Sequence, residues 1–263
     1  MARAFLCVDT AVLPLWAGLF RADLRGAGVA GKPFAFGEPF DHRGEMLHCI
    51  LCKPLIGAGL QEGADEDTAG VAGRAECRHD DAFLCWLADE LCRRHGLNAD
   101  NKFFTGMSNG GEMCYMIART HPGVFNAIAS IAGLTMKWID ESFPLKDPVP
   151  FMEVHGTADK TSMWEGDLSN SGGWGAYIAV PDAVDKMVKI DACKYLIHEY
   201  LPPLKEGSRT VVLHRWTGGV QAWKGGPECE VRLYEIRGGK HSWGLSDMDT
   251  CSAVWEFFQR YLR

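Results

Sequence analysis

The sequence predicts an α/β fold with a mostly parallel sheet and helices on both faces. From Asp80 onward, short apolar runs alternate with segments in which apolar residues recur at helical spacing. Helices that alternate with short apolar strands favour a parallel sheet covered on both sides. The chain has 263 residues, of which 47% are hydrophobic and 23% charged, so it can bury one sizeable core and is neither disordered nor fibrous.

Residues 1 to 79 do not share this pattern. They are rich in Ala and Gly, and their Val and Ile residues are scattered, whereas buried strands carry clusters of branched residues. Only Phe5–Val8 and Met46–Cys52 are typical of strands, and Gly57–Gly73 is typical of a loop. We therefore expect an atypical segment over residues 1–79 and the main α/β portion over residues 80–263, with the early strands of its sheet missing or aberrant. A shifted reading frame is one hypothesis for this composition, and translating the other two frames of the source DNA tests it.

The elements after residue 79 can be justified in order. Asp80 and Asp81 can cap a helix whose apolar residues Leu84, Leu87 and Leu91 share one face, and Gly96 can end it. Apolar runs and helical spacing then predict the remaining elements. The expected strands are 102–105, 125–131, 151–155, 210–215 and 230–236, and the expected helices are 109–119, 180–200 and 250–262.

Charge and apolar run length exclude two classes of partner. The formal net charge is -7, and no dense run of Lys and Arg is present, so we expect no nucleic-acid partner. The longest apolar stretches are shorter than the roughly 20 residues that a membrane helix requires, so we also expect no membrane partner. The N-terminus begins like a signal peptide, but Asp9 interrupts its apolar run and no clear cleavage site follows.

Metals and cofactors are not expected either. The ten cysteines are scattered, which favours reduced, buried thiols. Cys49 and Cys52 form a C-x-x-C pair, but no second pair stands at the spacing of a zinc site. The glycine pattern of residues 26–31 matches a dinucleotide-binding motif, yet no strand precedes it and Lys32-Pro33 follows where a helix should begin.

Ser108 is the candidate nucleophile. The segment Gly106-Met107-Ser108-Asn109-Gly110 has the pattern G-x-S-x-G and stands between a predicted strand and a predicted helix, as in a nucleophile elbow. At so sharp a turn the flanking glycines let strand and helix approach each other without a Cβ clash. The turn also directs the helix N-terminus at the serine, so the backbone N–H of Asn109 can stabilise an oxyanion.

A serine hydroxyl near neutral pH needs a base and an orienting carboxylate, here expected in the chain order Ser, acid, His. Asp159 follows the apolar run 149–154 and is the candidate acid, with Asp167 and Asp182 as competitors that do not directly follow a strand. His241 is the candidate base, because it follows the last predicted strand through the glycine loop 237–240. The competing histidines are placed by the predictions in a helix (His198) and inside a strand (His214).

Three segments resemble a known family. The runs TGMSNGGEMCYMIARTHPGVFNAIASIAGL, VPFMEVHGTAD and GGKHSWG are similar to the poly(3-hydroxybutyrate) depolymerase/feruloyl and acetylxylan esterase group of the alpha/beta-hydrolase fold. The resemblance covers about residues 80–263. Residue by residue, it implies Ser108 as nucleophile, Asp159 as acid and His241 as base of a serine esterase.

The resemblance also implies a substrate class. The stretch WEGDLSNSGGWGAYIAVPDAV is closest to the branch that acts on plant cell-wall polysaccharide, so feruloyl or acetyl esters are the expected substrates, with polyhydroxyalkanoate esters as the alternative. Trp164, Trp174 and Trp243 are candidates for binding sugar or aryl rings, although core packing explains buried tryptophans equally well. Such enzymes are commonly secreted or periplasmic, while the N-terminus leaves a cytoplasmic location open. The sequence does not predict the oligomeric state.

One feature of the family is missing. Members carry a His-Gly-rich segment after an early strand, which supplies a second oxyanion N–H, and residues 1–79 contain no His-Gly pair. A catalytically impaired hydrolase-like protein is therefore a further alternative.

Overall fold

The computed structural model describes residues 3–8, 35–37, 46–51 and 66–263, with side chains from Asp80 onward except for His95. The chain divides into two compact units, residues 1–99 and 100–263. The larger unit carries all candidate site residues.

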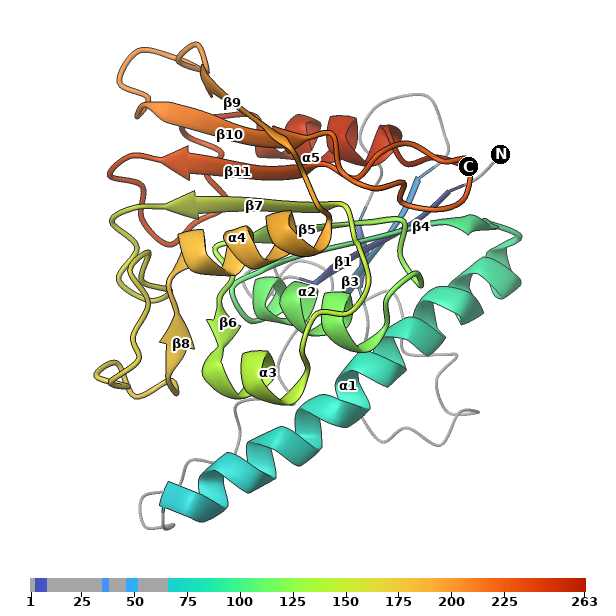
Figure 1. Ribbon diagram of the computed structural model, residues 1–263. Helices are drawn as coiled ribbons and strands as arrows, with labels where there is room; N and C mark the ends of the chain where they lie inside the picture. Colours follow the sequence, from blue (N-terminus) through green and yellow to red (C-terminus); the bar gives the residue numbers. More distant parts are fainter. Residues whose placement is uncertain (1–2, 9–34, 38–45, 52–65) are drawn as a thin grey trace. The chain divides into compact units, whose positions relative to one another are not determined.

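The larger unit is built on a six-stranded run of sheet in the order β4-β5-β7-β11-β10-β9 (Figure 1). The first four of these strands are mutually parallel. Strand β10 is antiparallel to β11 and to β9. The bounds are β4 (Asn98–Met107), β5 (Ala127–Ile131), β7 (Phe151–Gly156), β9 (Tyr195–Tyr200), β10 (Val211–Thr217) and β11 (Val231–Ile236).

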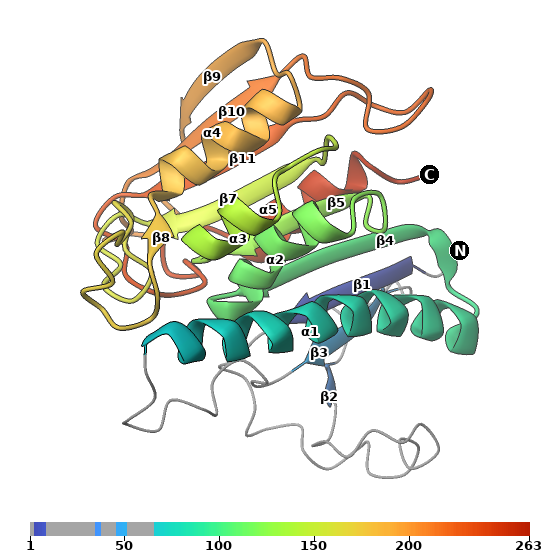
Figure 2. The ribbon, with the colours of Figure 1, turned by 60° about the horizontal axis from the view of Figure 1, so that its bottom comes forward.

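Helices cover both faces of this sheet. Figures 1 and 2 show α2 (Asn109–Thr120) and α4 (Val180–Ile190) on one face and α5 (Thr250–Gln259) on the other. Aromatic pairs mark the two sides of the core. Phe258 of α5 stacks on Phe103 at 4.9 Å between ring centroids, and Tyr115 of α2 packs on Phe151 at 4.7 Å. The expected sheet with helices on both faces is confirmed.

Three smaller elements flank β7 in sequence. The short helix α3 (Lys137–Ser142) directly follows β6 (Thr135–Met136), which pairs antiparallel with β8 (Tyr177–Ile178). The chain between β7 and β8 includes Asp159 and two of the candidate tryptophans.

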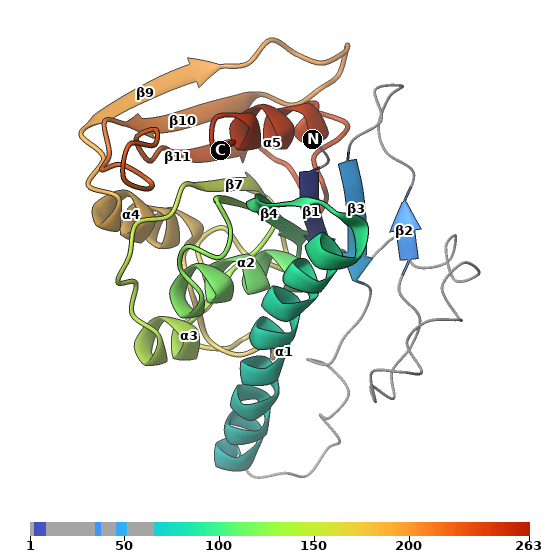
Figure 3. The same cartoon turned by 90° about the vertical axis from the view of Figure 1, so that its right-hand side faces the viewer.

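In the smaller unit, the residues that the structure describes form three short strands and one long helix (Figure 3). Strand β1 (Arg3–Val8) is parallel to β3 (Met46–Leu51), and β2 (Ala35–Gly37) is antiparallel to β3. The strands expected at 5–8 and 46–52 are confirmed, except that Cys52 lies outside the described residues. Strand β2 was not predicted, because its sequence Ala-Phe-Gly has no branched residue.

The helix α1 (Glu66–His95) corrects two predictions. Its residues up to Gly73 were expected in a loop, and the helix was expected to begin at Asp80. Good helix formers such as Ala69, Ala72 and Arg74 offset the two internal glycines, each of which costs about 1 kcal/mol relative to Ala. The rest of the expected loop, residues 57–65, lies outside the described residues.

The helix expected over 180–200 is also corrected. It ends at Ile190, because Ala192 adopts a left-handed conformation with φ of 52°, and the chain then turns into the edge strand β9. His198 therefore lies on a strand. The helices expected at 109–119 and 250–262 are confirmed in place. Among the residues that the structure describes, no helix combines the length and apolar character needed to cross a bilayer.

Candidate active site

Ser108 lies at a strained turn between β4 and α2. Its φ of 58° and ψ of -118° are unusual for a residue with a side chain, and such strain persists only where the surroundings impose it. The Ser108 N–H donates to the carbonyl of Ile131 at the end of β5, at 2.9 Å. A Cβ added to Gly106 would lie 2.6 Å from the backbone of Gly110, so only glycine permits this approach. This is the backbone geometry of a nucleophile elbow.

The first turn of α2 begins directly after Ser108. Asn109 is its first residue and is exposed. The first N–H groups of a helix have no partner within the helix, and the helix dipole favours negative charge there. The backbone N–H of Asn109 is thus suited to receive an oxyanion formed at Ser108. One turn further, burial raises the pKa of the half-buried Glu112 to about 7.

Asp159 follows β7 and is held firmly. One of its carboxylate oxygens, Oδ1, accepts hydrogen bonds from the backbone N–H groups of Thr161 (2.8 Å) and Ser162 (2.9 Å). The other, Oδ2, accepts from Nδ1 of His241 at 2.7 Å. Burial raises the pKa of a carboxyl group, but these hydrogen bonds and the charge of His241 outweigh it, so the pKa of Asp159 lies below its ordinary value.

His241 reaches Asp159 because the loops after β7 and β11 touch. The Ala158 N–H donates to the carbonyl of Gly239 at 2.8 Å, and a Cβ added to Gly156 would lie 2.4 Å from the backbone of Gly239. The ionised Asp159 can only accept, so Nδ1 of His241 carries the hydrogen. Its Nε2 is then free to accept a proton, as a general base must.

Asp159 and His241 are hydrogen-bonded to each other. Within residues 80–263, the Ser108 hydroxyl forms no hydrogen bond with either of them. All three residues nevertheless follow parallel strands: Ser108 follows β4, Asp159 follows β7 and His241 comes after β11. The carboxyl ends of parallel strands lie at one edge of the sheet, so the three residues all lie at that edge.

The competitors for acid and base serve other purposes. Asp167 folds its own loop, accepting from the N–H groups of Ser171 (3.0 Å) and Gly172 (2.8 Å), which hold its pKa at about 2. Asp182 is exposed in the first turn of α4. His198 and His214 bond to each other across β9 and β10, with 2.9 Å between their Nδ1 atoms.

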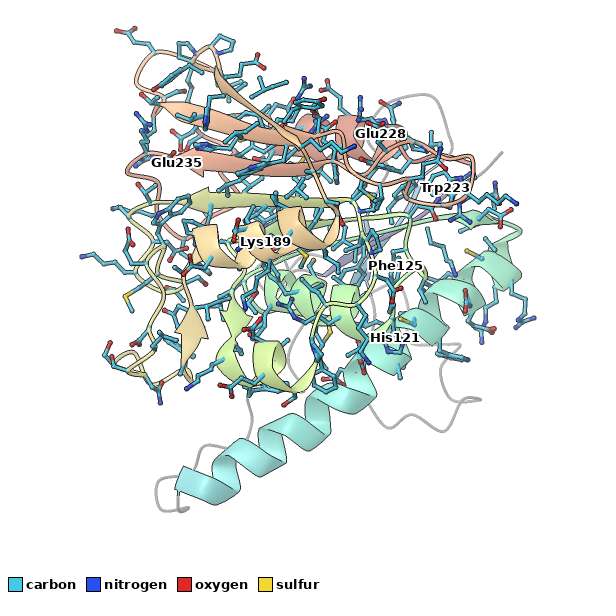
Figure 4. The ribbon with its side chains drawn as sticks, in the orientation of Figure 1. His121, Phe125, Lys189, Trp223, Glu228 and Glu235 are labelled. Atoms are coloured by element: carbon cyan, nitrogen blue, oxygen red, sulfur yellow. The ribbon has the colours of Figure 1, made fainter. Side chains whose placement is uncertain are left out.

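The tryptophans occupy different environments. Trp174 is 69% exposed on the glycine-rich loop before β8. Trp164 is half-buried with its ring edge-to-face against His155, and Trp243 is half-buried two residues after His241. Trp223 lies with Glu228 at the end of β11 opposite Glu235 (Figure 4). Trp223 therefore stands away from the edge that carries the site, whereas Trp164 and Trp243 come after the carboxyl ends of β7 and β11.

Sequence reasoning missed two buried polar residues on β7. Glu153 and His155 are fully buried and bond to each other, with 2.9 Å between Oε1 and Nδ1. The available signal was their spacing, since residues two apart in a strand share one face and both interrupt an apolar run. Among residues that the structure describes, no group of three or more His, Cys, Asp or Glu could hold a metal ion, and Cys193, Cys229 and Cys251 carry free thiols.

Comparisons with known proteins point to esterases. No protein-family model matches the chain. Over 108 residues, covering 41% of the chain and 31% of the relative, it is 29% identical to the candidate esterase NocK of Nocardia uniformis. Over 140 residues, covering 53% of the chain and 46% of the relative, it is 24% identical to the candidate feruloyl esterase C of Aspergillus terreus. The chain thus spans less than half the length of these relatives.

The fold is that of the alpha/beta-hydrolases. The crystal structure of the esterase PE8 superposes with a TM-score of 0.50, covering 99% of this chain and 93% of that one at 14% identity. This likeness concerns the fold alone.

Proposed function

We propose that this protein is a serine carboxylic ester hydrolase that acts through an acyl-enzyme. The observation that carries the proposal is the 2.7 Å hydrogen bond between Nδ1 of His241 and Oδ2 of Asp159, at the sheet edge where Ser108 occupies a strained elbow. This arrangement supplies a nucleophile, a base with a free Nε2 and an orienting carboxylate.

The chemistry is two successive acyl transfers. Ser108 Oγ attacks the ester carbonyl while Nε2 of His241 takes the hydroxyl proton, and the Asn109 N–H donates to the tetrahedral oxyanion. His241 then returns the proton to the leaving alcohol, which departs and leaves the acyl group on Ser108. Water, deprotonated by His241, then attacks the acyl carbonyl, and His241 gives this proton to Ser108 Oγ as the carboxylic acid departs. Throughout, Asp159 fixes the tautomer of His241 and stabilises its charged form.

Feruloyl or acetyl esters of plant cell-wall polysaccharide are the proposed substrates. The similarity to a candidate feruloyl esterase C supports this choice, as does the exposed Trp174, whose ring offers a flat apolar face for an aryl group or sugar. Trp243 is the proposed second ring contact because it lies close to His241 in sequence. The polyester alternative shares the same chemistry and differs only in the alcohol and acyl groups.

Turnover of p-nitrophenyl acetate tests the activity. We expect Ser108→Ala to abolish hydrolysis above background and Ser142→Ala, an exposed serine at the end of α3, to retain it. Equal rates for wild type and Ser108→Ala would contradict the proposal and favour an impaired hydrolase-like protein. Methyl ferulate, acetylated xylan and a short 3-hydroxybutyrate oligomer then separate the substrate classes.

A further inference from the structure

A buried polar chain lies behind Asp159. His155, on β7, is 1% exposed, and both of its ring nitrogens have partners. Nδ1 lies 2.9 Å from Oε1 of Glu153, and Nε2 lies 2.8 Å from the carbonyl oxygen of Ser162. Its ring edge also meets the ring of Trp164, with 6.1 Å between centroids. Because the ring is buried, these partners decide its protonation state.

The partners of His155 require a hydrogen on both ring nitrogens. A backbone carbonyl can only accept, so Nε2 must donate to Ser162. Burial raises the pKa of the Glu153 carboxyl above its ordinary value, but His155 beside it and the hydrogen bonds that it accepts from the Tyr115 hydroxyl (3.1 Å) and the Gly133 N–H (3.3 Å) favour the ionised form. Nδ1 then donates to Glu153 as well. Burial lowers the pKa of His155, but Glu153 outweighs burial and the pKa lies above its ordinary value.

This buried imidazolium lies next to the acid of the active site. Nε2 of His155 is 3.7 Å from Oδ2 of Asp159, and this same oxygen accepts from His241. Ser162, whose carbonyl binds His155, donates its own N–H to Asp159. The carboxylate of Asp159 is therefore placed between two imidazoles, one exposed to substrate and one buried.

We propose that His155, held by Glu153, is a positioning residue that fixes the turn 159–162. We further propose that it reduces the electrostatic stabilisation that Asp159 gives to the protonated form of His241. This inference rests on the proposed function. A positive charge near Oδ2 stabilises the Asp159 carboxylate and repels the charged form of His241, so the base releases its proton more readily. The titratable groups that act directly on His155 are Glu153 and Asp159. Glu153 in turn accepts from Tyr115, and Asp159 interacts with His241 and Tyr177.

The pH profile of kcat/KM tests the charge effect. His155→Gln keeps a donor for Ser162 but removes the positive charge, so the acid limb, which reports deprotonation of His241, should move up by about 0.5 to 1 pH unit. Glu153→Gln should shift the limb in the same direction, because His155 loses the partner that keeps it charged. His214→Gln, on β10 and outside this chain of contacts, is the matched control and should leave the limb in place.

Each outcome separates this inference from the proposed function. Hydrolysis that depends on Ser108 in the wild type, with an unmoved acid limb in His155→Gln, would overturn the inference alone. Absence of such hydrolysis in the wild type overturns the proposed function instead. If the variants do not fold, ¹⁵N NMR of labelled histidine rings in the wild type decides: one ring should keep both N–H groups above the pH at which the other rings have lost one, and no such ring would overturn the inference.

Discussion

At the scale of single residues, the site depends on which nitrogen of His241 carries its hydrogen. The Asp159 carboxylate accepts from Nδ1 and, through two backbone N–H groups, is itself fixed in the turn after β7. The carboxylate therefore acts as an acceptor that selects one tautomer, and a replacement that donates would select the other.

Asp159→Asn tests this selection. Its amide can keep the contacts with Thr161 and Ser162 but would donate to Nδ1 of His241, which places the hydrogen on Nε2 and blocks its role as base. We expect kcat to fall by about 10³- to 10⁴-fold in p-nitrophenyl acetate hydrolysis, as for wrong-tautomer variants of other triads. Asp167→Asn is the control and should keep the rate. A loss of less than tenfold in Asp159→Asn would contradict the role of Asp159.

Glu112 gives the pH dependence of stability a definite sign. Burial raises its pKa in the folded state to about 7, above the ordinary value of a glutamate, so the folded protein binds this proton more tightly than the unfolded chain does. Stability should therefore fall as the pH rises from about 4.5 to 7. Thermal melting of Glu112→Gln, with the exposed Glu141→Gln as control, should lack this loss. An identical pH dependence in wild type and Glu112→Gln would contradict the shifted pKa.

At the scale of elements, the elbow is set by how closely β4 and α2 approach. Gly106→Ala places a Cβ against the backbone of Gly110, where no flexible side chain can yield. We expect a loss of roughly 2 kcal/mol or more in urea unfolding, together with loss of activity. Gly123→Ala, at φ of 80° with open space around it, should cost about 1 kcal/mol and spare activity. Equal effects of the two variants would contradict the steric account.

Sequence reasoning succeeded for elements that bury one regular apolar pattern. The buried runs of β5, β7 and β11 and the periodic helices α2 and α5 were predicted near their observed places. Sequence reasoning failed for segments in which the apolar residues show no regular spacing. All six side chains of β9 are exposed, so nothing distinguished it from the helix before it, and the start of α1 is rich in Ala and Gly. This segment is a strand because it pairs with β10, and the local sequence does not indicate that pairing.

At the scale of the whole molecule, sheet order assembles the site. Ser108, Asp159 and His241 were predicted because each lies in a local motif after a strand. The buried chain from Tyr115 through Glu153 to His155 was not, because its partners come from α2, the end of β5 and the loop after β7, which only the folded sheet brings together. Local sequence motifs thus predicted the three candidate catalytic residues, whereas the buried residues that position them became visible only from the folded structure.

Labelling with a fluorophosphonate, mapped by mass spectrometry, tests the central claim most directly, because the reagent needs both an activated serine and an oxyanion site. We expect one adduct, on the peptide that contains Ser108, and its loss in Ser108→Ala and in His241→Ala but not in His214→Ala. An adduct on another serine, or labelling of Ser108 that persists at the same rate in His241→Ala, would contradict the account.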